Sequence, residues 1–269
     1  MKLAKATTNH SKTSTDPIVV IGNGMVGHRF CRAFRELDAT TPVVVIGKEP
    51  TPAYDRVNLT KLVADPDPDK LLLAPAAWYA QNHNDLRLGE SVHAVDTEAQ
   101  TVTTGRGETL SYGALVIASG SNPWIPPIPG ATGRRVYPYR TIKDIEAIRA
   151  AAARGKTAAV IGGGLLGLEA AQALNDLGVE TRVLEAADYL MPRQLDAEGG
   201  ILLKEEISNM GIIVHTRCQT KEIVDIADQK ALRFAEGDAL TRDFIVISAG
   251  IRPETTFLES SAIERNPHG

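Results

Sequence analysis

The first glycines of the chain are spaced as in loops that hold the pyrophosphate of a dinucleotide. Gly22, Gly24 and Gly27 follow the β-branched run Ile18–Ile21, which is typical of a strand buried on both faces. In a strand–GxGxxG–helix unit, the first glycine permits a tight turn, the second lets the backbone approach a pyrophosphate, and the third lets helix and strand pack closely. The following helix start offers unpaired N–H groups and a positive dipole end. The alternative is that these glycines only pack a crossover.

The same pattern recurs one domain length later. Gly162, Gly164 and Gly167 lie between an expected strand, 157–161, and an expected helix, 168–177. Two copies in full strand–loop–helix context are a far more specific signal than one, and they form an internal repeat. Three residues that lie between the last two glycines of a copy are candidate binding residues as well: Met25, Leu165 and Leu166.

An acidic residue is expected about twenty residues after each loop, where it accepts a hydrogen bond from a ribose hydroxyl. Glu185 fits the second copy, and its charge would repel the 2′-phosphate of NADP, which favours NAD. Arg182 and Arg193 lie close enough to keep NADP open. In the first copy Glu49 is the candidate, displaced by a residue or two from the strand end, and a plain surface charge is the alternative.

Composition excludes several classes of function. The 269 residues carry 29 Lys and Arg against 33 Asp and Glu, a formal charge of −4, so nucleic acid is a poor partner. No apolar run approaches the roughly 18 residues of a membrane span. Cys31 and Cys218 are distant and form no CxxC, which leaves no metal site, iron–sulfur cluster or redox dithiol. We expect a soluble protein in the reducing cytoplasm, with a disordered tail over 1–16.

The order of expected elements indicates an α/β fold with two Rossmann-like, doubly wound domains. Short alternating runs over 86–116 predict a small antiparallel excursion that returns to the first sheet. The proline-rich stretch 122–130 is expected to connect domains. Further elements are expected as helices 28–37, 59–63, 142–153 and 199–210, and as strands 42–46, 179–185, 212–215 and 244–248. Two dinucleotide sites in one chain, without cysteine pair or metal set, leave hydride transfer from a nicotinamide to a flavin as the chemistry.

Seven motifs together resemble one known family. They are VVIGNGMVGHRF, PAYDRVNLTK, LVIASGSNPWIPPIPG, YRTIKDIEAIR, AAVIGGGLLGLEAAQAL, QLDAEGG and FIVISAGIRP. They are similar to the N-terminal flavin-reductase part of the NAD(P)H-dependent nitrite reductase large subunit and, more broadly, to two-domain reductases of the rubredoxin and ferredoxin reductase type. The resemblance implies that the first copy binds FAD and that the inserted second copy binds NAD(P)H, with NADH favoured.

The resemblance also implies roles for residues outside the glycine loops. Arg56 would lie along the FAD phosphates and ribityl chain, the Val92 backbone would meet the adenine, and Ser119 and Gly120 would close over FAD. Gly250 would face the nicotinamide or the flavin edge. A solvated arginine and plain strand-end turns are the alternatives for these positions.

Lys61 and Glu169 are the candidate catalytic pair, because relatives bring a lysine and a glutamate together near the reactive flavin nitrogen. The lysine would stabilise negative charge on the reduced flavin, and the glutamate would orient it. The alternatives are a solvated lysine and a carboxylate favoured at a helix start by the dipole alone. Nitrite-reductase subunits often carry another residue at the position of Lys61.

The resemblance implies an incomplete chain, since relatives continue with a flavin-holding segment and a C-terminal interface domain. We expect an FAD domain over 17–123 and 243–269 and an NAD(P) domain over 124–242. The expected function is an NAD(P)H:flavin oxidoreductase, with no siroheme or iron–sulfur cluster of its own. The acceptor would be a siroheme and iron–sulfur nitrite-reducing part or a small redox protein. Alternatives are a truncated nucleotide-binding fragment without turnover and a truncated rubredoxin or ferredoxin reductase.

Overall fold

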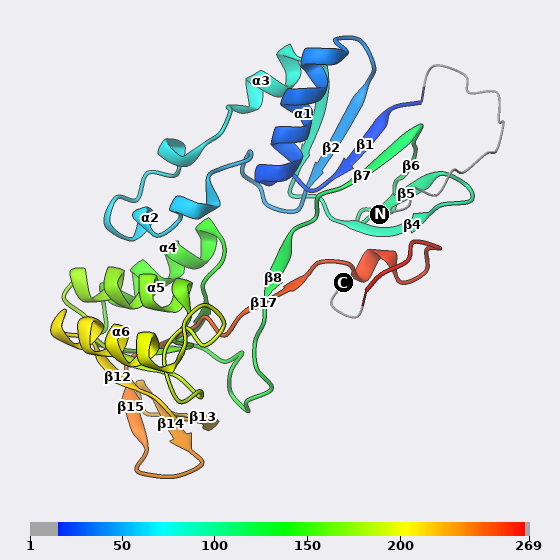
Figure 1. The fold of residues 1–269 in the computed structure, drawn as a ribbon. Helices are drawn as coiled ribbons and strands as arrows, with labels where there is room; N and C mark the ends of the chain where they lie inside the picture. Colours follow the sequence, from blue (N-terminus) through cyan, green and yellow to red (C-terminus); the bar gives the residue numbers. More distant parts are fainter. Residues whose placement is uncertain (1–15, 267–269) are drawn as a thin grey trace. The chain divides into compact units, whose positions relative to one another are not determined.

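The computed structural model describes residues 16–266, which form two compact units (Figure 1). Within this range, unit 1 comprises residues up to Tyr54, Leu72–Gly120 and the residues from Glu254 onward. Unit 2 comprises Asp55–Leu71 and Ser121–Pro253. The tail predicted over 1–16 lies outside the described residues, apart from its last residue.

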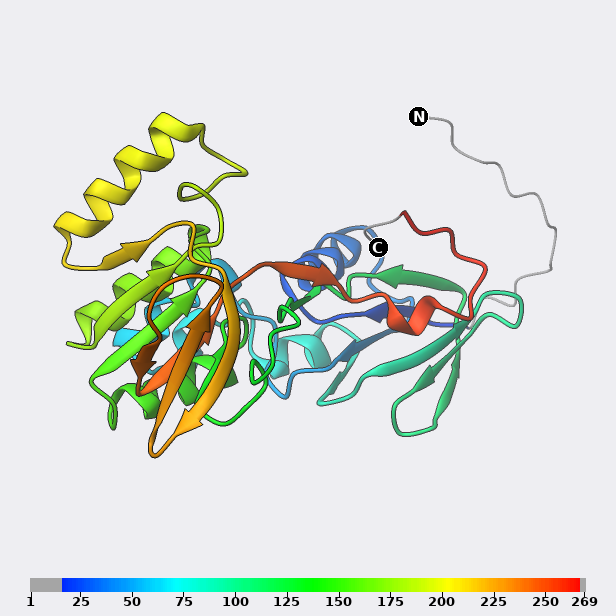
Figure 2. The same ribbon diagram turned by 90° about the horizontal axis from the view of Figure 1, so that it is seen from below.

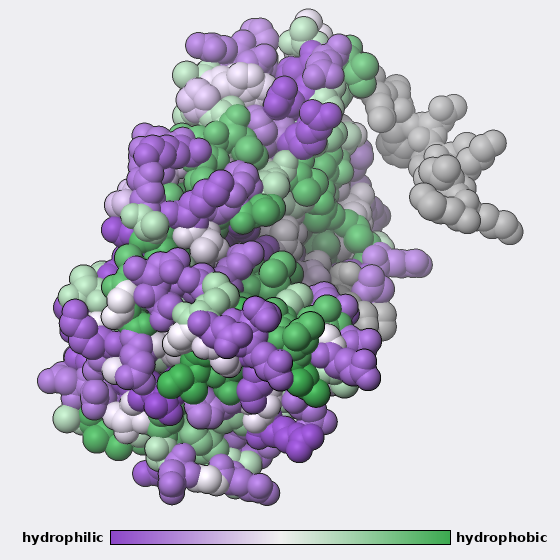
Figure 3. Space-filling view, turned by 60° about the vertical axis from the view of Figure 1, so that its left-hand side comes forward, coloured by the Kyte–Doolittle hydropathy of each residue, from purple (hydrophilic) through white to green (hydrophobic). Residues whose placement is uncertain are grey.

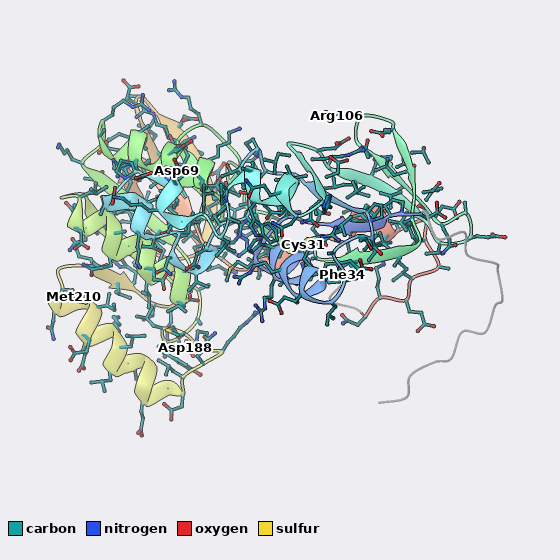
Figure 4. All side chains as sticks on the ribbon, turned by 90° about the horizontal axis from the view of Figure 1, so that it is seen from above. Cys31, Phe34, Asp69, Arg106, Asp188 and Met210 are labelled. Atoms are coloured by element: carbon teal, nitrogen blue, oxygen red, sulfur yellow. The ribbon has the colours of Figure 1, made fainter. Side chains whose placement is uncertain are left out.

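Unit 1 is built on a four-stranded parallel sheet with the order β3-β2-β1-β7. Successive side chains of a strand point to opposite faces, so the sheet has two apolar faces. Val20, Val43 and Val45 lie on the face covered by α1 and α3. They pack there with Cys31 of α1, and Cys31 is labelled in Figure 4. The elements are β1 (Ile18–Ile21), α1 (Met25–Leu37), β2 (Val43–Gly47), α3 (Ala76–Gln81), β3 (Asn84–Leu88) and β7 (Ala114–Ile117).

A three-stranded antiparallel sheet and a 3-10 turn cover the other face of this sheet. Val19, Val44 and Ile46 pack there in one buried cluster with Val95 and Phe257. The antiparallel excursion expected over 86–116 is therefore confirmed over 92–111 with its return to the sheet in β7, whereas residues 86–88 belong to the parallel strand β3. Residues near the end of the described chain complete the same core. The elements are β4 (Val92–Asp96), β5 (Thr101–Thr104), β6 (Thr109–Ser111) and η3 (Thr256–Leu258).

Unit 2 repeats this plan with a five-stranded parallel sheet of order β12-β11-β10-β16-β9. Helix α5 packs on β10 and β11, and α6 packs on β12. A second antiparallel three-stranded sheet covers the opposite face with Ile223 and Leu232 (Figure 2). The elements are β9 (Val136–Pro138), α4 (Ile142–Ala152), β10 (Thr157–Ile161), α5 (Leu165–Asp176), β11 (Glu180–Leu184), α6 (Ala197–Asn209), β12 (Ile213–His215), β13 (Thr220–Ile226), β14 (Gln229–Phe234), β15 (Leu240–Arg242) and β16 (Phe244–Ile247).

The repeat thus extends far beyond the glycine loops. In each unit, three parallel strands are followed by an antiparallel three-stranded excursion and then by a last parallel strand beside the first one. That last strand is β7 in unit 1 and β16 in unit 2, and both pair in parallel with the strand before the glycine loop. The two units are two copies of one supersecondary plan.

Segment 55–71 belongs to unit 2, although it interrupts unit 1 in sequence. It consists of η1 (Arg56–Asn58), α2 (Lys61–Ala64) and η2 (Pro68–Leu71). Helix α2 packs on α4 and α5, and the Arg149 guanidinium donates hydrogen bonds to the carbonyl oxygens of Leu62 and Val63. These contacts attach the segment to unit 2.

Segment 55–71 was expected in the first domain, and two further domain boundaries also differ from those expected from the sequence. We expected residues 243–269 in the first domain, but β16 is hydrogen-bonded between β10 and β9 of unit 2. The chain returns to unit 1 only at Glu254. The expected connector 122–130 begins with a strand, β8 (Ser121–Pro123), which pairs antiparallel with β17 (Ile251–Pro253). Pro123 is tolerated there because both strands of a two-stranded sheet are edge strands.

The surface of the described residues mixes polar and apolar side chains. In the view of Figure 3, apolar residues lie scattered among hydrophilic ones. Among the described residues, no helix has the length and apolar character that a membrane crossing requires.

Candidate functional site: two glycine loops at sheet edges

The first glycine loop accepts only glycine at two of its three positions. Gly22 follows β1 with φ of +107°, and a Cβ on it would lie 2.1 Å from the carbonyl oxygen of Ala118. A Cβ on Gly27 would lie 2.0 Å from the carbonyl oxygen of Gly22. A Cβ on Gly24 would meet nothing within 4 Å. Gly22 and Gly27 therefore make the loop fold tightly, whereas Gly24 leaves its backbone open to a ligand.

The second glycine loop has the same geometry. Gly162 has φ of +117°, and a Cβ there would lie 2.3 Å from the carbonyl oxygen of Ser248. A Cβ on Gly167 would lie 2.0 Å from the carbonyl oxygen of Gly162, and one on Gly164 would meet nothing within 4 Å. The tight closure and the open middle position are thus duplicated.

Each loop opens a helix whose first N–H groups lack a side-chain cap. Gly24 is the N-cap residue of α1 and Gly164 that of α5, and neither can supply a capping side chain. Uncapped N–H groups at the positive end of a helix dipole bind anions such as a pyrophosphate. The predicted neighbours Met25, Leu165 and Leu166 are 39%, 56% and 37% exposed at these helix starts. Both loops therefore fit a dinucleotide.

Glu185 stands at the carboxyl end of β11, and its carboxylate reaches the second loop. Its Oε2 accepts the Gly163 N–H at 2.7 Å, and its Oε1 accepts the Ala187 N–H at 2.8 Å. Each carboxylate oxygen can accept a second hydrogen bond. Arg182 lies within β11, 3.6 Å from Glu180 Oε1 rather than at the strand end, and Arg193 is exposed. Glu185 is thus the charged side chain in contact with this loop.

Glu49 lies two residues beyond β2, as its displaced position in the sequence suggested. The Tyr54 hydroxyl donates to Glu49 Oε2 at 2.8 Å. The residue directly after Ile46 is Gly47, which holds the place that Glu185 has after Leu184 in unit 2. Val92 begins β4 and is half-buried against the core of unit 1.

A glycine with positive φ lies three residues after the last parallel strand of each unit. Gly120 after β7 has φ of +71°, and Gly250 after β16 has φ of +127°. The Ser119 hydroxyl donates to the carbonyl oxygen of Glu254 at 2.7 Å, and the Gly120 carbonyl accepts the Glu254 N–H at 3.0 Å. Both glycines lie at the carboxyl edge of a sheet, where open α/β sheets bind ligands.

Lys61 and Glu169 both lie in unit 2, but the structure does not bring their charges together. Among the described residues, no ion pair joins them. Instead the Thr60 hydroxyl donates to Glu169 Oε2 at 3.1 Å, and the buried Tyr139 hydroxyl donates to Thr60 Oγ1 at 2.9 Å. Burial, reinforced by the Glu169 charge, raises the pKa of Tyr139 to about 12, so it remains a donor at neutral pH.

Two other predicted residues are placed by segment 55–71. Lys61 is exposed and lines a pocket of about 280 Å³ with the acidic residues Asp55, Asp65 and Asp67. Its charge helps to lower the pKa of Asp55, although hydrogen bonding by Asn58 is the main cause. Arg56 is half-buried and donates to the carbonyl oxygen of Arg140 in unit 2.

Comparison with known proteins assigns this geometry to a family. The model of the pyridine nucleotide-disulphide oxidoreductase family matches residues 16–269. The chain belongs to this family. It is therefore a pyridine-nucleotide oxidoreductase module, in agreement with the resemblance noted in the sequence.

Particular relatives of this oxidoreductase are much longer proteins. The nitrite reductase (NADH) large subunit of Escherichia coli is 41% identical over 94% of the chain and 30% of its own length. The assimilatory nitrate reductase electron transfer subunit of Bacillus subtilis is 37% identical over 93% of the chain and 33% of its own. The chain thus spans about a third of these relatives. A ferredoxin reductase from Rhodopseudomonas palustris shares the fold at 24% identity, with a TM-score of 0.88 over 93% of the chain and 63% of its own.

The disulphide in the family name has no counterpart among the described residues of this oxidoreductase. Cys31 and Cys218 are free thiols, one in each unit. Burial raises the pKa of Cys31 to about 11 and also raises that of Cys218, so neither is a thiolate at neutral pH. The described residues also contain no group of three or more potential metal-ligating side chains.

Sequence reasoning missed four polar residues of these sites. Thr60 and Tyr139 hold Glu169, and Asn23 and Tyr79 are hydrogen-bonded beside the first glycine loop. Thr60 stands next to the predicted Lys61, so its hydroxyl was a signal in the sequence. The partners Tyr79 and Tyr139 are distant in sequence, and only the fold brings them there.

Proposed function

We propose that the chain is the NAD(P)H:FAD reductase module of a nitrite-reducing system. The observation that carries the proposal is that the glycine loop occurs twice with the same geometry. Gly22 and Gly27 fold the first loop tightly, Gly162 and Gly167 fold the second, and the middle glycine of each loop leaves its backbone accessible to a ligand. Two such loops in one chain supply two dinucleotide sites, as transfer between two dinucleotides requires. Similarity to nitrite reductase large subunits supports the choice of system.

FAD fits the loop of unit 1, and NAD(P)H fits the loop of unit 2. The α1 N-terminus would bind the FAD pyrophosphate, and the α5 N-terminus that of the nicotinamide dinucleotide. We propose that these residues surround FAD: Gly22, Gly24, Met25, Gly27, Glu49, Arg56, Val92, Ser119 and Gly120. We propose that these bind NAD(P)H: Gly162, Gly164, Leu165, Leu166, Gly167, Glu185 and Gly250. Bound FAD takes a hydride as an electron pair and can release the electrons onward.

We propose NADH as the preferred donor, because the Glu185 carboxylate would accept hydrogen bonds from the adenine ribose and repel a 2′-phosphate. The Gly163 and Ala187 N–H groups hold that carboxylate in place. We propose that Glu169, fixed by Thr60 and Tyr139, orients the nicotinamide end, and that the exposed Lys61 contributes positive charge. The acceptor would be a siroheme and iron–sulfur part or a small redox protein in the cytoplasm.

The visible spectrum of the purified chain, supplied with FAD, tests this function. We expect a flavin band that bleaches when NADH is added without oxygen and bleaches more slowly with NADPH. A chain that binds NADH but shows no flavin band after reconstitution would be a nucleotide-binding protein without turnover, and the proposed function would fail.

Lys61 and Glu169 are expected to act independently, because Thr60 rather than Lys61 holds the glutamate. Lys61→Met and Glu169→Gln should each slow flavin reduction, and the double variant should show the product of the two effects, with a coupling energy below about 0.5 kcal/mol. Thr60→Val should reproduce part of the Glu169→Gln effect. Stopped-flow measurement of all variants would contradict this expectation if the coupling reached about 1 kcal/mol or more.

A further inference from the structure

The two glycine loops can be compared residue by residue, because the units repeat one plan. Ile21 of β1 pairs with Ile46 of β2, and Ile161 of β10 pairs with Leu184 of β11. The position after the first glycine is Asn23 in unit 1 and Gly163 in unit 2. The residue that follows Ile46 in unit 1 is Gly47, and the residue that follows Leu184 in unit 2 is Glu185.

In each unit, one side chain fills the space between the glycine loop and the end of the second strand. The loop supplies this side chain in unit 1, and the strand end supplies it in unit 2. In unit 2 it is Glu185, and a Cβ on Gly163 would lie only 3.0 Å from its Cβ. In unit 1 it is Asn23, and a Cβ on Gly47 would lie only 2.9 Å from its Cβ. Each unit thus has room for one side chain at this place, and each pairs it with a glycine.

The side chains also fix the loops by different hydrogen bonds. Glu185 accepts the backbone N–H of Gly163 in the second loop. Asn23 belongs to the first loop itself, and its Oδ1 accepts the Tyr79 hydroxyl at 2.8 Å. Tyr79 is fully buried on α3, more than fifty residues further along the chain, and packs in the core beneath the sheet.

His28 completes the arrangement in unit 1. Its Nδ1 lies 3.0 Å from the Tyr79 hydroxyl oxygen, and the residue is 3% exposed. Because the single hydroxyl proton is donated to Asn23, Nδ1 of His28 must be the donor to Tyr79. Burial lowers the pKa of His28 and raises that of Tyr79, so both stay neutral. Within the described part of the chain, Nε2 of His28 has no hydrogen-bond partner.

We propose that Tyr79, oriented by His28, is the positioning residue that holds the first glycine loop in its binding conformation through Asn23. Glu185 does the same for the second loop. The ligand concerned at the first loop is a dinucleotide pyrophosphate, and this part rests on the proposed function. Consequently, a substitution that removes the hydrogen bond of one loop should increase the mobility of that loop and leave the other loop unchanged.

Tyr79→Phe tests the proposal, because it keeps the buried ring and removes only the hydroxyl. Tyr112→Phe is the matched control: Tyr112 is also buried in unit 1, and its hydroxyl bonds to the Asp96 carbonyl, away from the loop. Amide hydrogen exchange of the ligand-free chain should become about tenfold faster over residues 22–27 in Tyr79→Phe, the size expected for one lost hydrogen bond. Residues 162–167 should not change, and Tyr112→Phe should change neither loop.

A rescue experiment separates positioning from general loss of stability. Asn23→Gly should loosen the first loop as Tyr79→Phe does, and adding Gly47→Glu should install the arrangement of unit 2 and restore slow exchange over 22–27. Asn23→Gly leaves Tyr79 in the core, so it also serves if Tyr79→Phe fails to fold. Equal acceleration in both loops, or no acceleration over 22–27, would overturn the proposal.

FAD titration links the loop to binding. The Kd for FAD should rise about tenfold in Tyr79→Phe, while the Kd for NADH stays unchanged. Wild-type protein that binds no FAD would contradict the proposed function, whereas hydrogen exchange in ligand-free protein still decides whether Tyr79 holds the loop. Normal FAD binding in wild type and an unchanged Kd in Tyr79→Phe would overturn the positioning role alone.

Discussion

Gly24→Ala and Gly164→Ala should each weaken binding of one dinucleotide and leave the fold intact. Both glycines have extended backbone, and an added Cβ would meet nothing within 4 Å. The free energy of unfolding should change by less than about 1 kcal/mol, since reduced chain entropy and a poorer N-cap oppose each other. The methyl group would stand where a pyrophosphate approaches the backbone, and strain of about 1–3 kcal/mol there weakens binding by roughly 5- to 150-fold.

The neighbouring glycines provide the contrasting variants. In Gly22→Ala and Gly162→Ala the Cβ would overlap a carbonyl oxygen, and the residue must keep a positive φ. The backbone conformation costs an alanine roughly 1–2 kcal/mol and the overlap about 1–3 kcal/mol more, so these variants should unfold at distinctly lower denaturant concentration. Chemical denaturation and titration with FAD and NADH measure both effects. The interpretation would be wrong if Gly24→Ala bound FAD normally or if Gly22→Ala were as stable as wild type.

Glu185→Ala should weaken NADH binding by about 10- to 100-fold and nearly abolish the preference over NADPH. The variant loses a carboxylate that we propose binds the ribose, and it leaves the Gly163 and Ala187 N–H groups without their acceptor. Hydrogen bonds to a charged group contribute about 1.5–3 kcal/mol, which corresponds to this range. Removing the negative charge also removes repulsion of a 2′-phosphate.

Glu180→Ala is the control for Glu185→Ala. It removes a carboxylate at the other end of the same strand, where Glu180 pairs with Arg182 and Arg242. NADH and NADPH affinities should stay at wild-type values, because this end of β11 is remote from the glycine loop. Titration of both variants with both dinucleotides is the measurement, and equal losses in the two variants would show a general effect of charge.

Local sequence was sufficient to predict most of the parallel strands and both glycine loops. Ile18–Ile21 and the following glycines carry their own signal, because a β-branched run and the spacing of the glycines can be read within one segment. The expected strands, helices and antiparallel excursion of unit 1 were therefore correct within a few residues. The sequence did not reveal that the repeat includes the antiparallel sheet and the last parallel strand of each unit, because the two copies share an order of elements more than a sequence.

The remaining differences depend on contacts between distant residues. β9 is a short strand that exists because Val136 and Tyr137 pair with β16, a hundred residues later. The late boundary at Glu254 follows from the same sheet. Tyr79 with Asn23, and Thr60 with Glu169, are single hydrogen bonds across more than fifty residues. No periodicity or motif in one segment can reveal such a partner.

The pairing of β8 with β17 brings together the two ends of the long segment of unit 2 that is inserted into unit 1. Residue 121 begins the inserted segment and residue 253 ends it, and these two residues are register partners. Gly120 and Glu254, the unit 1 residues on either side, share a hydrogen bond of 3.0 Å. Because entry and exit are adjacent, a short turn from 120 to 254 would close unit 1 after excision of 121–253, and segment 55–71 would then lose its contacts with α4 and α5. Such a junction suits gene duplication and the exchange of one nucleotide-binding unit for another.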